Sequence, residues 1–294
     1  MARAGYGPAP LDGSRRTAYA TCVNAEAPPP PAPTPLPGLD AAADGAPQGR
    51  PGIVLRTLGF ADPLRWLALG WADFRRAPAI GLFYGACFTV MGWALMRVYQ
   101  HAPAYLLALS AGFLLVAPFL CLGIYHVSRE LQAGRKPDFG ASLMAWESRM
   151  GQLGIFAFVL LVLEMLWARS TLVIFAVTFD GMPDFKGSIA ALFDPENITF
   201  IVAWAIVGAI FATLIFSVSV VSMPMLLDRA TDAITAALTS LRLVLTQAPV
   251  MFFWGALIAA ITFVAMAPAF VGLVVVAPVI GHASWHAYRA AVAD

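Results

Sequence analysis

The chain has 294 residues, of which 60% are hydrophobic and only 12% are charged, and its mean hydropathy is +0.76. Soluble domains carry roughly 25% charged residues, so this composition excludes an ordinary soluble domain and predicts that lipid surrounds much of the chain. The net charge of +1 provides no overall attraction to nucleic acid or to an anionic surface. Three cysteines, Cys22, Cys87 and Cys121, lie far apart without a C-x-x-C pair, and we expect none of them in a disulfide or a metal site.

The first 52 residues differ in composition from the rest of the chain. They are rich in Ala, Pro and Gly, and residues 28–31 are four consecutive prolines. Such a segment buries too little apolar surface to offset its ordering entropy. It also lacks the basic and apolar regions of a cleavable signal peptide. We therefore predict a disordered Pro/Ala-rich tail over 1–52 and a transmembrane domain over 53–294.

An amphipathic helix is predicted over residues 60–76, immediately before the first long apolar run. A helix with one apolar stripe and several charges is typical of a segment that lies in the membrane interface. The predicted apolar stripe consists of Leu64, Leu67, Trp71 and Phe74.

Long apolar runs then predict an all-α bundle of about six transmembrane spans. A polar, basic loop at 128–150, which ends in an interfacial segment, and a third amphipathic segment at 226–247 separate pairs of spans. An acidic loop follows the third span. The third run is about 28 residues long, or roughly 40 Å as a helix, so it must tilt, kink or protrude. The predicted spans are 78–99, 104–127, 152–179, 198–222 and two spans within 249–286 that meet near Pro268.

The distribution of Lys and Arg predicts the orientation in the membrane. Segments 53–77, 128–150 and 224–247 carry four, four and two of them, whereas the opposite loops carry essentially Lys186 alone. Basic loops stay on the cytoplasmic side. We therefore expect a multi-pass protein of a bacterial-type inner membrane with both termini in the cytoplasm.

Three stretches of the chain share one sequence pattern, which indicates an internal repeat. An amphipathic segment leads into an Ala-Pro pair at Pro78 and again at Pro249, and each is followed by a span with an early glycine. In the partner spans, Pro118 precedes His126 by eight residues, and Pro278 precedes His286 by the same spacing. The middle section follows this pattern more loosely. The predicted units are three parallel hairpin repeats over about 60–132, 138–229 and 230–290.

Four stretches of the sequence, at 118–130, 222–229, 237–242 and 254–255, resemble a bacterial family of predicted integral membrane proteins, the domain-of-unknown-function 2189 family. The resemblance is expected to extend over about residues 55–292 and to leave the proline-rich tail outside. It implies an integral membrane protein and implies no particular activity.

Charged residues inside or beside spans are candidate functional groups, because burying a charge in lipid is costly. Glu164 lies within an apolar run and is either a cation- or proton-handling carboxylate or a structural partner of Arg169 near the interface. Asp228 and Arg229 follow the fourth span and, with Asp232, are expected to form a charged network with Arg242 or Arg129, which either fixes the interfacial helices or binds a substrate.

Histidines at the ends of two spans are the remaining candidates. His282 and His286 share one helical face, and His126 is the repeat equivalent of His286, so the three could converge as haem or metal ligands. Aromatic residues beside them favour an ordinary interfacial role. The sequence contains no hydrolase, metalloprotease or nucleotide-binding motif. We expect no catalytic residue, metal ion or cofactor, and we expect the protein not to be an enzyme.

Three classes of function fit these features. A transporter-like or channel-like protein for an unidentified small solute predicts a polar cavity between the repeats. A non-catalytic membrane scaffold or assembly factor predicts a solid apolar core. A haem- or metal-binding redox subunit requires His126 and His286 to lie within ligating distance. The expected partners are the lipid bilayer and either another membrane protein or a second copy of the chain, and no nucleic acid.

Overall fold

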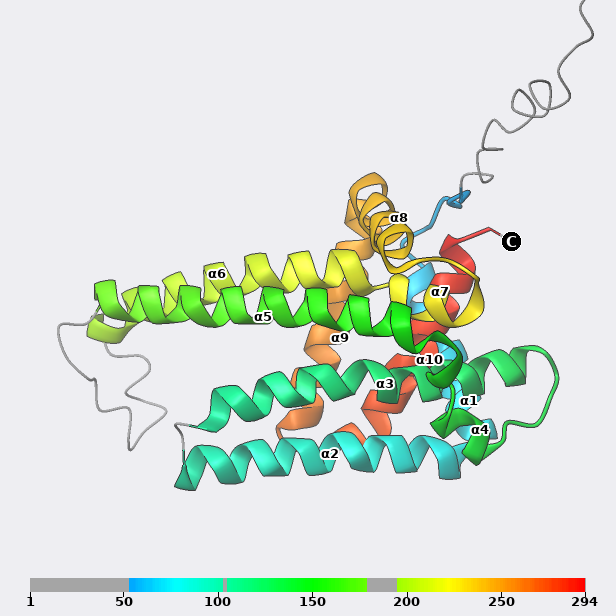
Figure 1. Cartoon of the computed structure of the whole chain (residues 1–294), viewed down its shortest axis with the longest axis horizontal. Helices are drawn as coiled ribbons and strands as arrows, with labels where there is room; N and C mark the ends of the chain where they lie inside the picture. The colour runs from blue at the N-terminus through cyan, green and yellow to red at the C-terminus, as the bar shows by residue number, and fades with distance from the viewer. Residues whose placement is uncertain (1–52, 103–104, 179–194, 294) are drawn as a thin grey trace, which may run out of the picture. The chain divides into compact units, whose positions relative to one another are not determined.

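A computed structural model describes residues 53–102, 105–178 and 195–293, and residues 53–294 form one compact unit. The predicted tail at 1–52, including Cys22, and the acidic loop at 180–196, apart from its last two residues, lie outside the described residues. Within the described ranges the secondary structure is helical, apart from an isolated bridge between Leu55 and Val292 (Figure 1). The helices are α1 (Asp62–Arg76), α2 (Pro78–His101), α3 (Leu106–Gln132), α4 (Phe139–Leu143), η3 (Glu147–Arg149), α5 (Met150–Thr178), α6 (Pro195–Ser219), α7 (Ser222–Asp228), α8 (Ala233–Thr246), α9 (Ala248–Met266) and α10 (Leu273–Ala291).

Four helical stretches of the described chain are long and apolar enough to cross a membrane. They carry apolar side chains on most of their surface, as expected for helices in contact with lipid. The protein is therefore an all-helical membrane protein. The four stretches are Pro78–His101, Met150–Thr178, Ile198–Asp228 and Ala248–Met266.

The two Ala-Pro pairs mark two helix breaks of the same kind. Ala77, between α1 and α2, has φ −133° and ψ 57°, and Gln247, between α8 and α9, has φ −130° and ψ 39°. In both breaks the N–H of this residue donates to the carbonyl four residues earlier, and a proline occupies the first turn of the next helix. Proline lacks an N–H and is tolerated in a first turn. The sequence pattern thus corresponds to two equivalent bends in the backbone.

Helix α10 lies at the centre of the packing and contacts α1, α2, α3 and α9. The closest approaches are made at glycines of α1 and α2. A Cβ atom at Gly70 would lie 2.6 Å from the Val279 carbonyl oxygen, and one at Gly85 would lie 1.9 Å from that of Val274. Only glycine allows the α10 backbone to come this near.

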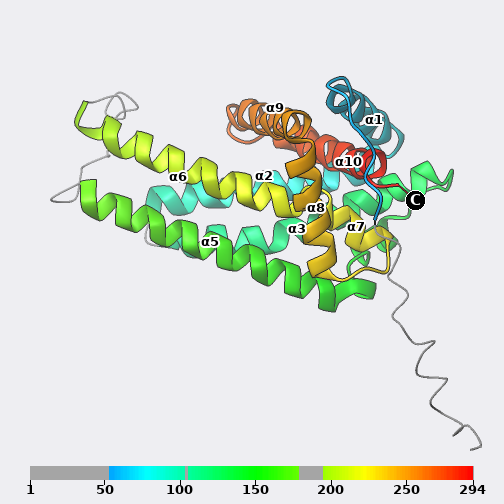
Figure 2. The ribbon, with the colours of Figure 1, turned by 90° about the horizontal axis from the view of Figure 1, so that it is seen from above.

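Adjacent helices form hairpins, and two of the amphipathic helices lie across them. α2 packs beside α3, α5 beside α6 and α9 beside α10 (Figures 1 and 2). Figure 2 shows α8 running across α6 rather than along it, and these two helices are in contact. On the other side, the Trp66 ring of α1 meets the Trp254 ring of α9 edge-on, with 5.5 Å between centroids.

Two details of the predicted helices are corrected by the structure. Helix α3 continues to Gln132 through the start of the predicted 128–150 loop. Gly134, two residues beyond its end, has a φ of +71° that suits a helix terminus. The fourth span was expected to stop near Pro224, but α6 ends at Ser219, and Pro224 instead occupies the first turn of α7.

The predicted apolar stripe of α1 is partly exposed, because Leu64 and Trp71 are 56% and 43% exposed. Apolar side chains that remain exposed can contact a membrane surface. The buried face of α1 consists of Pro63, Trp66, Gly70, Asp73 and Phe74, of which Phe74 also belongs to the stripe.

Candidate functional site

A buried carboxylate joins three helices near one end of the bundle. Asp73 of α1 is only 4% exposed, and its Oδ2 accepts hydrogen bonds from Ser128 Oγ of α3 at 2.9 Å and from His286 Nε2 of α10 at 2.8 Å. Ser128 Oγ lies 2.7 Å from Nδ1 of His282, which is also on α10. We call these four residues the Asp73 cluster.

The donors and acceptors of the Asp73 cluster form one ordered chain. Because a carboxylate only accepts, Ser128 and His286 must donate to Asp73, and Ser128 Oγ then accepts from Nδ1–H of His282. In neutral His282 this leaves Nε2 as a bare acceptor, and this atom is buried without a hydrogen-bond partner in the described part of the chain. Buried polar atoms normally have a partner.

The charge of Asp73 is stabilised by its neighbours. Burial raises the pKa of Asp73, but hydrogen bonds from His286 and Ser128 and the charges of the two histidines outweigh burial, so its pKa lies below the ordinary value of 3.8. Arg76 lies 4.0 Å from the other carboxylate oxygen, but its side chain is 64% exposed. Asp73 is therefore ionised at neutral pH.

Asp73 and Ser128 were not among the candidates predicted from the sequence. Asp73 is one of several charged residues in the predicted interfacial helix at 60–76. Its spacing from Trp66 and Gly70, at seven and three residues, places all three on one face of α1 and is the signal that identifies it as buried. Ser128 lies in one of the stretches that carry the family resemblance.

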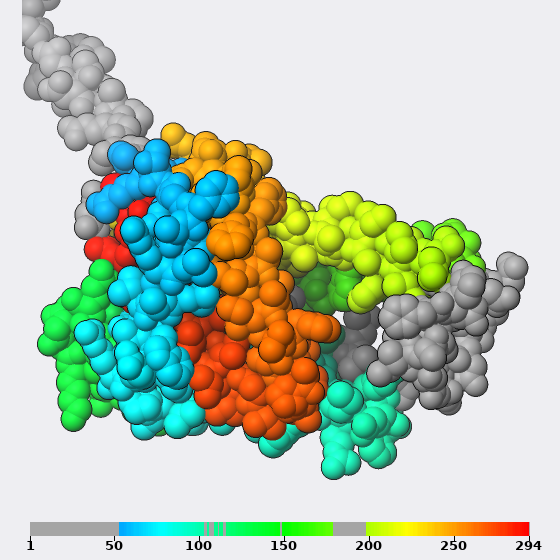
Figure 3. Space-filling model, turned by 180° about the vertical axis from the view of Figure 1, so that it is seen from behind, coloured from blue at the N-terminus to red at the C-terminus, as the bar shows by residue number. Residues whose placement is uncertain are grey.

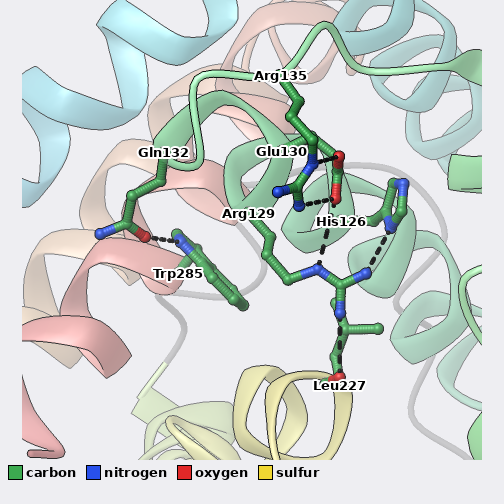
Figure 4. A network of polar contacts seen from close by, with 7 residues as sticks. All are labelled: His126, Arg129, Glu130, Gln132, Arg135, Leu227 and Trp285. Atoms are coloured by element: carbon green, nitrogen blue, oxygen red, sulfur yellow. Dashed lines mark hydrogen bonds and ion pairs between the residues drawn. The ribbon is translucent and has the colours of Figure 1, made fainter. Parts of the chain in front are cut away.

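A second network joins α3 to α7 and α10 at the same end of the bundle (Figure 4). Arg129 donates to the Leu227 carbonyl at 3.3 Å, contacts His126 Nδ1 at 3.1 Å and lies 3.8 Å from Glu130. Glu130 also accepts two hydrogen bonds from Arg135, at 2.6 and 2.8 Å. Separately, Trp285 donates to Gln132 at 2.9 Å. Arg129 therefore ties the end of α3 to α7.

Asp228 and Arg229 meet on Tyr288 of α10. The Tyr288 hydroxyl donates to Asp228 at 2.8 Å and accepts from Arg229 Nε at 2.9 Å, while Arg289 forms an ion pair with Asp228 at 3.1 Å. Arg229 also donates to the Ala293 carbonyl. Asp232 caps α8 by accepting from the Thr235 N–H at 2.8 Å. The end of α10 is thus fixed to α7.

The other predicted candidates are not brought together. Glu164 is partly exposed on α5, and it forms no ion pair with Arg169 in the described part of the chain. His126 contacts Arg129, whereas His282 and His286 belong to the Asp73 cluster. Among the described residues, no three His, Cys, Asp or Glu side chains are placed to share a metal ion. Cys87 and Cys121 are free thiols.

A cavity of about 420 Å³ lies between the hairpins, on the side of α10 opposite the Asp73 cluster. Binding pockets for small molecules have about this size and are mostly apolar. Figure 3 shows a hollow between α9 and α6, with α5 visible at its back. Side chains from every hairpin line the cavity, among them Phe88 of α2, Pro118 and Cys121 of α3, Leu160 of α5, Ser219 of α6, Thr262 of α9 and Ala277 and Ser284 of α10.

The apolar helices, their lipid-facing surfaces and the polar networks at one end define the class as an all-helical integral membrane protein. A family model described as "Predicted integral membrane protein (DUF2189)" matches residues 106–228, from α3 to α7, and confirms the resemblance predicted from the sequence. The match is shorter than the expected 55–292, so α1, α2 and α8 to α10 lie outside it. No curated protein and no solved structure matches the chain.

Proposed function

We propose that the protein is a transporter-like protein of the inner membrane that binds a small apolar solute in the cavity between its hairpins. The observation that carries this proposal is the cavity itself, because side chains of all three hairpins line it. A binding site at the meeting point of repeated units is the arrangement that transporters built from repeats use.

We further propose six spans, with α3 and α10 completing the hairpins begun by α2 and α9. The equivalent bends at Ala77 and Gln247 support two copies of one unit, each an amphipathic helix followed by a hairpin. The basic residues of α1, of the α3–α4 connection, and Arg229 and Arg242 after α7 and in α8 support a cytoplasmic location for the polar end and for both termini.

The cavity favours binding over a purely structural role. A scaffold predicts a solid core, whereas about 420 Å³ lies open between the hairpins. The predicted polar character of a transport cavity is not observed, because neither Glu164 nor Asp228 and Arg229 line it. An apolar cavity suits an uncharged, apolar solute, since a charged one would lose its hydration without a compensating partner.

A small photoreactive aromatic diazirine tests the proposed binding in the full chain reconstituted in nanodiscs. We expect carbene adducts on cavity residues such as Cys121, and we expect an excess of unlabelled aromatic compound to suppress them. The matched variants are Ala277→Phe, which fills the cavity, and Val275→Phe on the same helix, whose residue is 36% exposed and does not line the cavity. Equal labelling of Cys121 in both variants would contradict the proposal.

A further inference from the structure

The polar groups that line the cavity are largely used by their own helices. Ser219 Oγ donates to the Ile215 carbonyl at 2.6 Å, and Ser284 Oγ donates to the Ile280 carbonyl at 2.8 Å. Neither hydroxyl hydrogen is free to bind an occupant, and most of the remaining lining is aliphatic or aromatic. A cavity whose lining is mostly apolar favours hydrocarbon over a polar or charged occupant.

The cavity is elongated along the helices. On α10 its lining runs from Leu273 to Ser284, eleven residues or about 16 Å of helix. On α3 the lining runs from Ala117 to Tyr125, about 12 Å. The cavity is therefore longest in the direction of the membrane-spanning helices. This shape fits an extended hydrocarbon chain that lies along the bilayer normal.

The opening of the cavity lies between two membrane-spanning helices. α6 and α9 touch where a Cβ atom at Gly255 would lie 3.3 Å from the Phe216 ring, and Figure 3 shows a hollow between these two helices. Both helices belong to the candidate spans, and their flanking side chains Ile210 and Phe263 are 60% and 77% exposed. The opening is therefore bordered by lipid-facing surface, and an occupant can enter sideways from the hydrocarbon layer.

We propose that the occupant is a single hydrocarbon chain of a membrane lipid, which enters from the bilayer between α6 and α9. This inference rests on the proposed function, because it names the class of solute that the same cavity binds. Its chemistry is shared by the acyl chain of a phospholipid and by a free fatty acid.

Two chain-end photoprobes test the inference in nanodiscs that contain the full-length protein. One is palmitic acid with a diazirine at the end of its chain, and the other is a phosphatidylethanolamine that carries this acid as one of its chains. After irradiation, peptide mapping locates the adducts. We expect them on the cavity faces of α3 and α10, at Cys121 and between Leu273 and Ser284, and adducts from either probe support a chain occupant. The probe that labels more strongly identifies its source.

The variants Ala277→Phe and Val275→Phe separate the cavity from the outer surface. Filling the cavity is expected to lower adduct formation at Cys121 about tenfold, whereas the lipid-facing substitution leaves it unchanged. Thermal unfolding of each variant verifies its fold, and a failed Ala277→Phe fold is replaced by Ala277→Leu. Adducts confined to outward residues such as Phe263, equal in all variants, would overturn the inference. If the aromatic diazirine labels Cys121 while neither chain probe does, the inference fails and the proposed function stands.

Discussion

Replacing Asp73 tests how strongly the Asp73 cluster holds α1 to the bundle. Asp73→Ala removes two hydrogen bonds to a charged acceptor, each contributing about 1.5–3 kcal/mol, and leaves Ser128 and His286 without their partner. The substitution also removes the cost of burying the carboxylate, several kcal/mol, and this offsets part of the stability lost with the hydrogen bonds. The Arg76 pair adds little, because the Arg76 side chain is 64% exposed. We therefore expect Asp73→Ala to lower the free energy of unfolding by about 2–4 kcal/mol.

The contribution of Asp73 to the free energy of unfolding depends on pH, and the direction of the Asp73 pKa shift gives the sign of this dependence. Hydrogen bonds from His286 and Ser128 overcome burial and hold the pKa of Asp73 below its ordinary value of 3.8. The resulting stabilisation is fully present when the pH is above the pKa of Asp73 in the unfolded chain. It is lost as the pH falls through the pKa of Asp73 in the folded protein. Asp73→Asn does not titrate and is expected to cost about 1–2 kcal/mol at neutral pH. Its deficit relative to the wild type should therefore shrink below about pH 4.

Unfolding of the purified protein in mixed micelles, with increasing SDS and tryptophan fluorescence as the readout, measures both effects. Trp66 of α1 packs against Trp254 of α9, so release of α1 should change the signal. Arg76→Gln serves as the control, since it alters the exposed neighbour and should change stability by less than about 1 kcal/mol. A double-mutant cycle with His286→Gln isolates the coupling of the pair. The reasoning is refuted if Asp73→Ala is as stable as the wild type, or if the Asp73→Asn deficit grows on acidification.

Three further expectations concern packing, the second network and topology. Gly85→Ala should lower stability by about 3 kcal/mol or prevent folding, because the added Cβ would lie 1.9 Å from an α10 carbonyl oxygen. Unfolding in SDS measures this effect, and a variant as stable as the wild type would disprove the close approach. Tyr288→Phe should cost about 1–2 kcal/mol in the same assay, since it deprives Asp228 of a donor at 2.8 Å, and an unchanged stability would show that Arg289 compensates. Alkaline phosphatase inserted within residues 179–194 should be active and the same enzyme fused after Asp294 inactive; the reverse pattern would contradict cytoplasmic termini.

The helices of this chain were largely predictable because each has a strong local signal. The prolines at 78 and 249 mark two helix starts, and the predicted span at 152–179 agrees with α5 to within a few residues. The end of α3 was not predicted, because Ser128, Arg129 and Glu130 look like a polar loop and are equally compatible with a helix. Local composition does not decide between these two structures, and the contact of Arg129 with α7 favours the helix.

The candidate site was only partly predictable, because it depends on contacts between residues far apart in the chain. Asp228 and Arg229 were recognised from their place after a span, but their shared partner Tyr288 lies about sixty residues away. Asp73 and His286 are 213 residues apart. Helix α1 carries several charged residues, and only the position of Asp73 on the same face as Trp66 distinguishes it from the charged residues that are exposed to solvent. The cavity has no sequence signal of its own, because its lining residues are ordinary apolar side chains.

Helix α10 gives the two halves of the candidate site a physical connection. One of its faces carries His282 and His286 into the Asp73 cluster, and another presents Ala277 and Ser284 to the cavity. Its backbone is closely packed at the glycines of α1 and α2 and is held at its end by Tyr288. A helix fixed this tightly on one side cannot adapt freely to an occupant on the other. We therefore expect an occupant of the cavity to affect how tightly α1 packs, through the position of α10.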